Sequence, residues 1–449
     1  MLMAGVLTAR TRVRRRDHWD RDQLLTYQRR RLDRLVRHAI SRSAYYRERV
    51  GPLRGASLEQ LPVLTKETLM NEWDRVCTEP SLSLDSVEQQ LRSIEESGGD
   101  PAHGWRGRWW LAATGGTTGR RASLVWDRRE WAQVLASYAR VNDWAEVDLD
   151  LRHPVRTAIV SSLNPTHQSA VVGASLRSHM IPALRLDARA PMPDLVAELN
   201  AFEPRLLVAF ASMVGPLAVA QLEGRLRIAP EKVVAASEAL SDAARAAAQA
   251  AWGQRVVIDS YAATESASIA STCAQGGWHL YEDFVIAEPV DDEYRPVPVG
   301  RTGRRLLVTP LFSRTLPLIR YELTDSVRLS SRICTCGRPF ALLGSVEGRT
   351  EDTLVLVGAA GPVRVHPVVF HTALESSAPG GWQVEQLPDR LLVRLIGTEA
   401  APDAARARLL QALSRLGLAD VHVDVEVADA PVRTALGKAP LVKAHKNSG

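Results

Sequence analysis

LAATGGTTGRR, at residues 111–121, is the stretch from which the architecture of this chain is best predicted. Glycine lets the backbone adopt positive φ and approach an anion closely, while threonine hydroxyls and an arginine fork donate hydrogen bonds to that anion. An ordinary glycine- and threonine-rich turn is the alternative, because short glycine motifs recur by chance, and the stretch lacks the lysine of a Walker loop. We predict a phosphate-binding loop made of Thr114, Gly115, Gly116, Thr117, Thr118, Gly119 and Arg120.

The composition is that of a globular chain with two or more domains. The chain has 449 residues, of which 45% are hydrophobic and 24% are charged. The net charge is only +5, and no aromatic residues interleave the arginine cluster at residues 10–16, which favours a solvated terminus over a nucleic-acid surface. The opening MLMAGVL is too short and wrongly placed for a secretory signal. We therefore expect a cytoplasmic protein with neither nucleic acid nor membrane as a partner.

The segments on either side of the loop predict an α/β fold. Residues 20–50 have the period of an amphipathic helix, Thr65 is expected to cap another helix, and residues 80–105 have the composition of a surface loop. Farther along, apolar runs alternate with helical stretches, and this alternation predicts strands within 157–163, 206–212, 232–238 and 255–261 and helices within 195–202, 214–224 and 240–252.

Polar residues follow the predicted strands. Because strand ends gather at one edge of such a sheet, Ser237, Glu238 and Tyr261 should face the same crevice as the threonine loop. Tyr261, Thr264 and Glu265 lie within DSYAATES, at residues 259–266. An aromatic face, a hydroxyl and a carboxylate could stack a base, contact a phosphate and hold Mg²⁺, although an ordinary strand exit would have the same composition.

With these motifs the chain resembles the adenylate-forming superfamily of acyl-CoA ligases, adenylation domains and luciferases, and within it the phenylacetate-CoA ligase branch with its capsule-biosynthesis and coenzyme-ligase relatives. Six segments match family motifs in the right order: TGGTTGRR (114–121), AASEAL (235–240), SYAATE (260–265), TLPLIRYELTD (315–325), VEGRTED (346–352) and RTALGK (433–438). The chain departs from the family pattern at Arg120, which replaces a lysine, and at Gly115, Arg121, Ala262 and Thr324.

The resemblance implies ATP and magnesium as cofactors and a role for each matching residue. By the resemblance, Tyr261 would stack on adenine and Glu265 would bind magnesium. Asp325 would bind the ribose, and Arg349 would bind ribose or phosphate. The other implied positions are the nucleotide-side pair Ser237 and Glu238, the catalytic residues Thr264, Glu265 and Lys438, and the hinge at Glu351. Lys438 would stabilise charge along the line of attack.

A second constellation combines three cysteines with one histidine. Cys273 and His279 are spaced C-x5-H, and Cys334 and Cys336 form a C-x-C pair. Three thiolates and an imidazole make a closed tetrahedral set for structural zinc, and members of the resembled branch carry a similar cluster. Four scattered residues are the alternative, and C-x-C is tighter than the usual C-x2-C. Cys77 is expected to be a buried or idle thiol.

The composition changes after Arg349, where short strands and two helical stretches predict a compact α+β unit. We therefore predict a large adenylation domain of layered α/β sheets at residues 1–347 and a smaller, mobile α+β lid at residues 348–449. Lys438 lies far from the phosphate loop in sequence, so it can act only if the lid closes.

The predicted activity is that of an ATP-dependent ligase. A carboxylate attacks the α-phosphate, pyrophosphate leaves, and a thiol such as that of coenzyme A takes the acyl group. Three alternatives stay open: an amide- or N–N-bond-forming ligase of secondary metabolism, loading of a carrier-protein thiol, and a non-catalytic nucleotide- or zinc-binding scaffold. The acid pocket is expected around Asn164, His167, Phe210 and Ala236, which suggests a small or aryl, partly polar acid. A homodimer is also left open.

Overall fold

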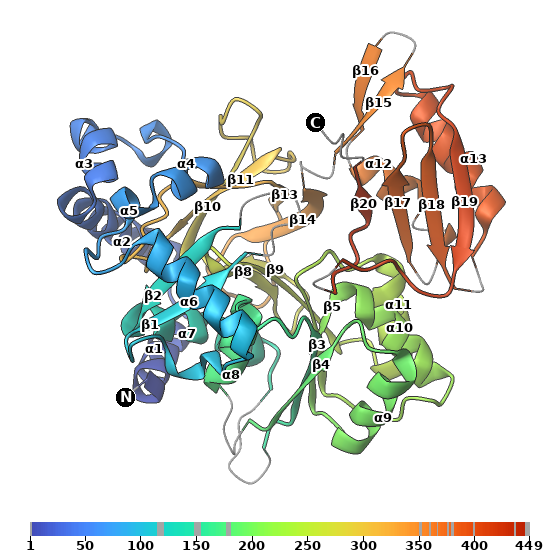
Figure 1. Ribbon diagram of the computed structural model, residues 1–449, viewed down its shortest axis with the longest axis horizontal. Helices are drawn as coiled ribbons and strands as arrows, with labels where there is room; N and C mark the ends of the chain where they lie inside the picture. Colours follow the sequence, from blue (N-terminus) through green and yellow to red (C-terminus); the bar gives the residue numbers. More distant parts are fainter. Residues whose placement is uncertain are drawn as a thin grey trace.

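The computed structural model describes residues 2–114, 121–147, 154–176, 181–349, 353–358, 361–365, 367–374, 377–378, 381–397, 400–434 and 437–444. Its layered α/β architecture confirms the predicted fold class (Figure 1). The largest element is a nine-stranded sheet in the order β13-β14-β9-β8-β7-β6-β5-β3-β4. None of the helices in these ranges is long and apolar enough to cross a lipid bilayer.

One half of this sheet is parallel, as the alternating sequence pattern predicted. Its strands are β3 (Thr157–Ser161), β4 (Ala183–Asp187), β5 (Leu206–Phe210), β6 (Lys232–Ala236) and β7 (Val257–Ala263). The connecting helices are α8 (Gln168–Leu176), α9 (Met192–Phe202), α10 (Ala211–Leu222) and α11 (Asp242–Trp252). Ser241 caps α11 by accepting a hydrogen bond from the Ala244 N–H. The carboxyl ends of β5, β6 and β7 therefore share one edge.

The other half is antiparallel and continues from β7. It contains β8 (Ala267–Thr272), β9 (Trp278–Leu280), β14 (Leu342–Arg349) and β13 (Asp325–Ser330). A separate antiparallel sheet is formed by β10 (Val285–Val290), β11 (Arg305–Pro310) and β12 (Tyr321–Leu323).

The strand before the threonine loop does not belong to the large sheet. β1 (Trp109–Ala113) and β2 (Ser123–Asp127) form a two-stranded antiparallel hairpin. At its tip the Thr114 N–H donates to the Ala122 carbonyl (3.0 Å), and Thr114 Oγ1 accepts from the Ala122 N–H (2.9 Å). Residues 115–120 of the predicted loop lie outside the described residues. Sequence periodicity could not distinguish the two arrangements, because a short apolar run fits either sheet.

Helices cover the amino-terminal part of the chain: α1 (Leu2–Arg16), α2 (Arg21–Arg42), α3 (Ala44–Arg49), α4 (Lys66–Asn71), α5 (Trp73–Val76), α6 (Leu84–Ser97) and α7 (Arg128–Trp144). Short 3-10 turns lie at Gly51–Leu53, Leu58–Gln60 and Pro101–His103. Thr65 caps α4 as predicted. Cys77, expected to be buried or idle, is buried, and burial raises the pKa of its thiol to about 12.

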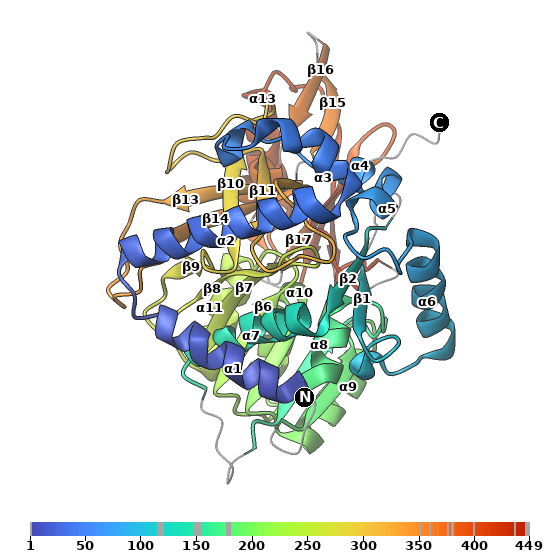
Figure 2. The ribbon, with the colours of Figure 1, turned by 90° about the vertical axis from the view of Figure 1, so that its left-hand side faces the viewer.

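One prediction for this region was wrong, and another holds only in part. Residues 80–105 contain the helix α6, which Ser83 caps and whose residues Val87 and Leu91 are fully buried. These apolar residues are spaced i, i+4 after a serine, so a helix signal was present among the polar residues. The arginine-rich terminus is solvated in part: Arg12, Arg14 and Arg15 are exposed, while α1 packs along α7 (Figure 2) and Arg10 pairs with Asp143.

The carboxyl-terminal part has a hydrophobic core of its own, centred on residues such as Phe370, Trp382 and Leu409. It comprises β15 (Leu354–Gly358), β16 (Gly361–Val365), α12 (Pro367–Leu374), β17 (Trp382–Gln386), β18 (Leu391–Ile396), α13 (Pro402–Ser414), β19 (Val423–Ala428) and β20 (Val442–Lys443). Sequence reasoning missed β17. The predicted boundary at 347/348 falls inside β14, so we propose a division just after that strand.

A fully buried ion-pair network joins the amino-terminal helices to the sheets. The Arg140 guanidinium on α7 donates to both carboxylate oxygens of Asp283 (2.6 and 2.8 Å) and lies 3.2 Å from Asp17 Oδ1. The Trp144 indole N–H donates to Asp17 (2.8 Å), and the Arg16 guanidinium lies 2.6 Å from Asp283. Removing one partner of such a pair leaves an uncompensated buried charge.

Arg140→Met should therefore lower the free energy of unfolding by about 3–5 kcal/mol, because two carboxylates would stay buried without their main partner. Urea unfolding followed by circular dichroism measures this change. Arg225→Ala is the control, because its pair with Glu223 is half exposed and should contribute less than about 1 kcal/mol. Equal effects of the two substitutions would contradict the importance of the network.

Candidate active site

Three residues predicted to hold the nucleotide converge from distant parts of the chain. Tyr261, on β7, donates its hydroxyl hydrogen to Asp325 Oδ2 at 2.7 Å. Asp325 opens β13 and is paired in register with Arg349, the last residue of β14. An aromatic ring and a buried carboxylate thus lie together at the rim of the large sheet.

Glu265 lies in the turn after β7 and is almost fully buried. The Tyr321 hydroxyl donates to its Oε1 at 3.3 Å. Next to it, the Thr264 carbonyl accepts from Gln168 Nε2 (2.9 Å), and Gln168 Oε1 accepts from the Tyr138 hydroxyl (2.8 Å). Tyr321 was not singled out from the sequence, although it lies within the family-like segment 315–325.

The carboxyl ends of β5 and β6 carry the other predicted residues of this edge. Phe210 is buried at the end of β5, and Ala236 ends β6. Ser237 has a φ of +68°, a left-handed conformation that turns the chain sharply after the strand. The Glu238 carboxylate accepts the N–H groups of Ser212 (3.0 Å) and Ala439 (2.7 Å). One of the nucleotide-side residues therefore contacts the carboxyl-terminal part.

A cavity of about 520 Å³ adjoins the hairpin that carries the threonine loop. Its lining residues are Glu95, Arg121, Ser162, Leu163, Asn164, Pro165 and Arg189. Glu95, on α6, accepts hydrogen bonds from Thr166 Oγ1 (2.7 Å) and Asn164 Nδ2 (3.3 Å) and pairs with Arg121. Burial opposes ionisation, but these partners together lower the pKa of Glu95. Sequence reasoning found Asn164 but missed Glu95, because α6 was predicted to be a loop.

Lys438 lies close enough to this region to affect His167. Burial lowers the pKa of the His167 imidazole to about 4, and the positive charges of Lys438, Arg121 and Arg185 contribute in the same direction. His167 is therefore neutral near pH 7 and can act as either donor or acceptor of a hydrogen bond. The structure thus brings the distant lysine to the predicted acid pocket.

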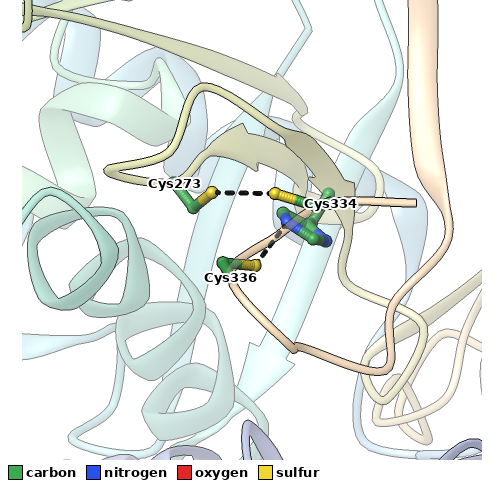
Figure 3. Close-up of side chains that lie close together, drawn as sticks. Cys273, Cys334 and Cys336 are labelled. Atoms are coloured by element: carbon green, nitrogen blue, oxygen red, sulfur yellow. Dashed lines mark hydrogen bonds between the residues drawn. The ribbon is translucent and has the colours of Figure 1, made fainter. Parts of the chain in front are cut away.

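The predicted metal ligands also converge (Figure 3). The ligand atoms of Cys273, His279, Cys334 and Cys336 all lie within 4.8 Å of one another. Cys273 Sγ is 3.7 Å from Cys334 Sγ, and Cys336 Sγ is 3.1 Å from His279 Nε2. Thiolates bound to tetrahedral zinc at about 2.3 Å lie about 3.8 Å apart, so the first distance fits such a site.

Two neighbouring features support the fit. Gly277 leaves room for the cluster, because a Cβ at that position would lie 2.5 Å from Cys334 Sγ. His279 Nδ1 lies 3.2 Å from the Phe340 carbonyl, which directs Nε2 toward the cysteines, and burial lowers the pKa of this imidazole to about 4. A neutral imidazole with a fixed orientation is the form that binds a metal.

Comparisons with known proteins agree with this architecture. No protein-family model matches the chain. The phenylacetate-coenzyme A ligase of Thermus thermophilus is 37% identical over 99 residues, so the match spans 22% of this chain and about a fifth of the relative (21%). A structure of 2-hydroxyisobutyryl-CoA ligase in the postadenylation state with 2-HIB-AMP has a TM-score of 0.70 at 19% identity and covers 97% of this chain and 92% of its own.

The fold is therefore similar to that of 2-hydroxyisobutyryl-CoA ligase, and the sequence match to phenylacetate-coenzyme A ligase is confined to about a fifth of the chain (22%). A second structure of 2-hydroxyisobutyryl-CoA ligase, in the thioesterification state with 2-HIB-AMP and CoA, has a TM-score of 0.59 at 20% identity and covers 96% of this chain and 92% of its own.

If Lys438 lies beside His167, then Lys438→Met should raise the pKa of His167 from about 4 toward its ordinary value of about 6.5, because a nearby cation disfavours the imidazolium. A histidine NMR titration of the two proteins measures the shift. Lys443→Met is the control, since Lys443 pairs with Glu385 within the carboxyl-terminal part. An unchanged His167 pKa in Lys438→Met would contradict the placement of the lysine.

Proposed function

We propose that this chain is an ATP-dependent ligase that converts a carboxylic acid to an acyl-adenylate with release of pyrophosphate and then transfers the acyl group to a thiol such as coenzyme A. The carrying observation is the docking of the Lys438 segment at the end of the parallel strands, where the Ala439 N–H donates to Glu238 (2.7 Å) and Gly437 lies beside Phe210 of the predicted acid pocket. A cation at this position can stabilise the negative charge that develops when a carboxylate attacks the α-phosphate.

The nucleotide would be held at the rim of the large sheet. Asp325 would accept hydrogen bonds from the ribose hydroxyls, Tyr261 would offer its ring to adenine, and Arg349 would add a positive charge for ribose or phosphate. The Tyr261–Asp325 hydrogen bond fixes two of these groups relative to each other. Positioning of this kind reduces the entropic cost of bringing reactants together.

Glu265 would hold magnesium, since a carboxylate oxygen is the ligand type that this ion prefers. When bound, magnesium would neutralise charge on the phosphates. Tyr321 orients this carboxylate through its hydroxyl, and Thr264 lies beside it.

The acid would be small or aromatic and partly polar. Its expected neighbours are His167, Phe210 and Ala236, which combine a neutral imidazole with apolar surface. The matched Thermus thermophilus relative bears the name of an aryl-acid ligase, and the solved neighbour that of a small hydroxy-acid ligase. Coenzyme A is the proposed acceptor, because both of these proteins are named as coenzyme A ligases.

A pyrophosphate-release screen over aryl, amino-aryl and short aliphatic acids, with and without coenzyme A, tests this function. Glu265→Gln should lower pyrophosphate release by about a hundredfold or more, because the amide keeps the shape but loses the charge that holds the metal. Glu293→Gln, at an exposed turn, is the matched control. If product forms with amines and not with coenzyme A, the acceptor is an amine and not a thiol. If no acid leads to pyrophosphate release, the ligase proposal is contradicted.

We further propose that Cys273, His279, Cys334 and Cys336 hold one structural zinc. With four ligands no coordination position is left for a substrate, so the ion would act as a clip. The clip would join β9, through His279, to the segment between β13 and β14 that carries the C-x-C pair.

Protein purified without chelator should contain about one zinc per chain, and Cys334→Ser should lose that metal and melt at a lower temperature. Elemental analysis and differential scanning calorimetry measure the two effects. Cys77→Ser is the matched control, because Cys77 is also buried but lies outside the cluster. Wild-type protein free of zinc would end this proposal and leave the ligase proposal untouched.

A further inference from the structure

The loop that carries Lys438 is tied to the large sheet by one carboxylate. Glu238 follows β6, and one of its oxygens accepts the N–H of Ser212 in the first turn of α10 (3.0 Å). Its other oxygen accepts the N–H of Ala439, the residue directly after Lys438, at 2.7 Å. A carboxylate that accepts two backbone N–H groups makes strong, directional bonds, because the acceptor is charged.

Further contacts hold the same loop in place. The Lys438 carbonyl accepts from the Thr434 N–H, and the Thr434 carbonyl accepts from the Gly437 N–H, both at 2.8 Å, so Thr434 is bonded to both Gly437 and Lys438. Arg433 donates to the Gly437 carbonyl (2.8 Å) and to Ser212 Oγ (3.2 Å). The turn is therefore hydrogen-bonded internally and attached to α10.

Gly437 provides the left-handed backbone conformation at the point where the Lys438 loop contacts the sheet. Its φ is +81°, and an added Cβ would lie 3.4 Å from Arg189 Cγ and 3.7 Å from Phe210 Cε2. Figure 1 shows the segment after β19 running down to the ends of β5 and α10. Ala439 directly follows Lys438, so the hydrogen bond that fixes the Ala439 backbone also determines where Lys438 lies.

We propose that Glu238 is a positioning residue for adenylation, which holds the Lys438 loop against the sheet and so sets the lysine at the acid pocket. This role rests on the proposed ligase function and differs from the nucleotide contact that the family resemblance implies for Glu238. The contact joins the two parts of the chain only in the arrangement seen here. It favours this arrangement and has to break whenever the parts separate.

The test compares Glu238→Gln with the wild-type enzyme in two half-reactions. Both oxygens of Glu238 accept a backbone N–H, whereas the glutamine amide has only one oxygen and an NH₂ group in place of the other. One of the hydrogen bonds to Ser212 and Ala439 is therefore lost. The kcat of pyrophosphate release should fall about tenfold to a hundredfold, while KM for ATP stays unchanged. Transfer from preformed acyl-adenylate to coenzyme A should be unaffected. Glu231→Gln, at the opposite end of β6 and paired with Arg205 at the surface, is the matched control.

Other outcomes would overturn the proposal. A raised KM for ATP with unchanged kcat would assign Glu238 to the nucleotide, and equal loss in both half-reactions with a lower melting temperature would make its role merely structural. A readout independent of activity is the His167 pKa, which should rise in Glu238→Gln as Lys438 moves away. An unchanged His167 pKa would overturn the proposal even if the chain proved not to be a ligase.

Discussion

The buried salt bridge between Arg140 and Asp283 is the constraint on which the large part of the chain depends. Both side chains are fully buried, so neither charge can be satisfied by water, and the elements that carry them have to stay together. Through Asp17 the bridge also holds the end of α1, and its neighbour Trp144 packs edge-on against His279 and Tyr281. The amino-terminal helices and the antiparallel half of the sheet therefore form one rigid support.

The cysteine cluster is connected to the proposed nucleotide edge through β13 and β14. Cys334 and Cys336 lie in the segment that joins β13 to β14, and His279 lies on the adjacent strand β9. Holding these strands together fixes the start of β13, where Asp325 accepts the hydrogen bond from Tyr261. A closed zinc site there would order the nucleotide edge without contacting the nucleotide.

The contact between the two parts of the chain is of a different kind. The carboxyl-terminal part has its own apolar core, and its loop reaches the sheet through hydrogen bonds to Glu238 and Ser212 and through the packing of Gly437. A small number of polar contacts breaks and re-forms more easily than a continuous apolar core does. Such an interface suits a part that has to move, whereas the Arg140 network suits one that does not.

The sequence by itself determined the α/β fold class, the parallel strands β3, β5, β6 and β7, the caps at Thr65 and Ser241 and the cysteine cluster, because each depends on local periodicity or on motifs a few residues long. It misassigned α6 although a local helix signal was present, and it did not reveal the ion pair of Arg10 with Asp143, because those partners are distant in the chain. Only the tertiary structure brought Glu95 to the cavity, Tyr261 to Asp325 and Ala439 to Glu238. These contacts follow from the order of the strands and the docking of the carboxyl-terminal part, which no local pattern encodes.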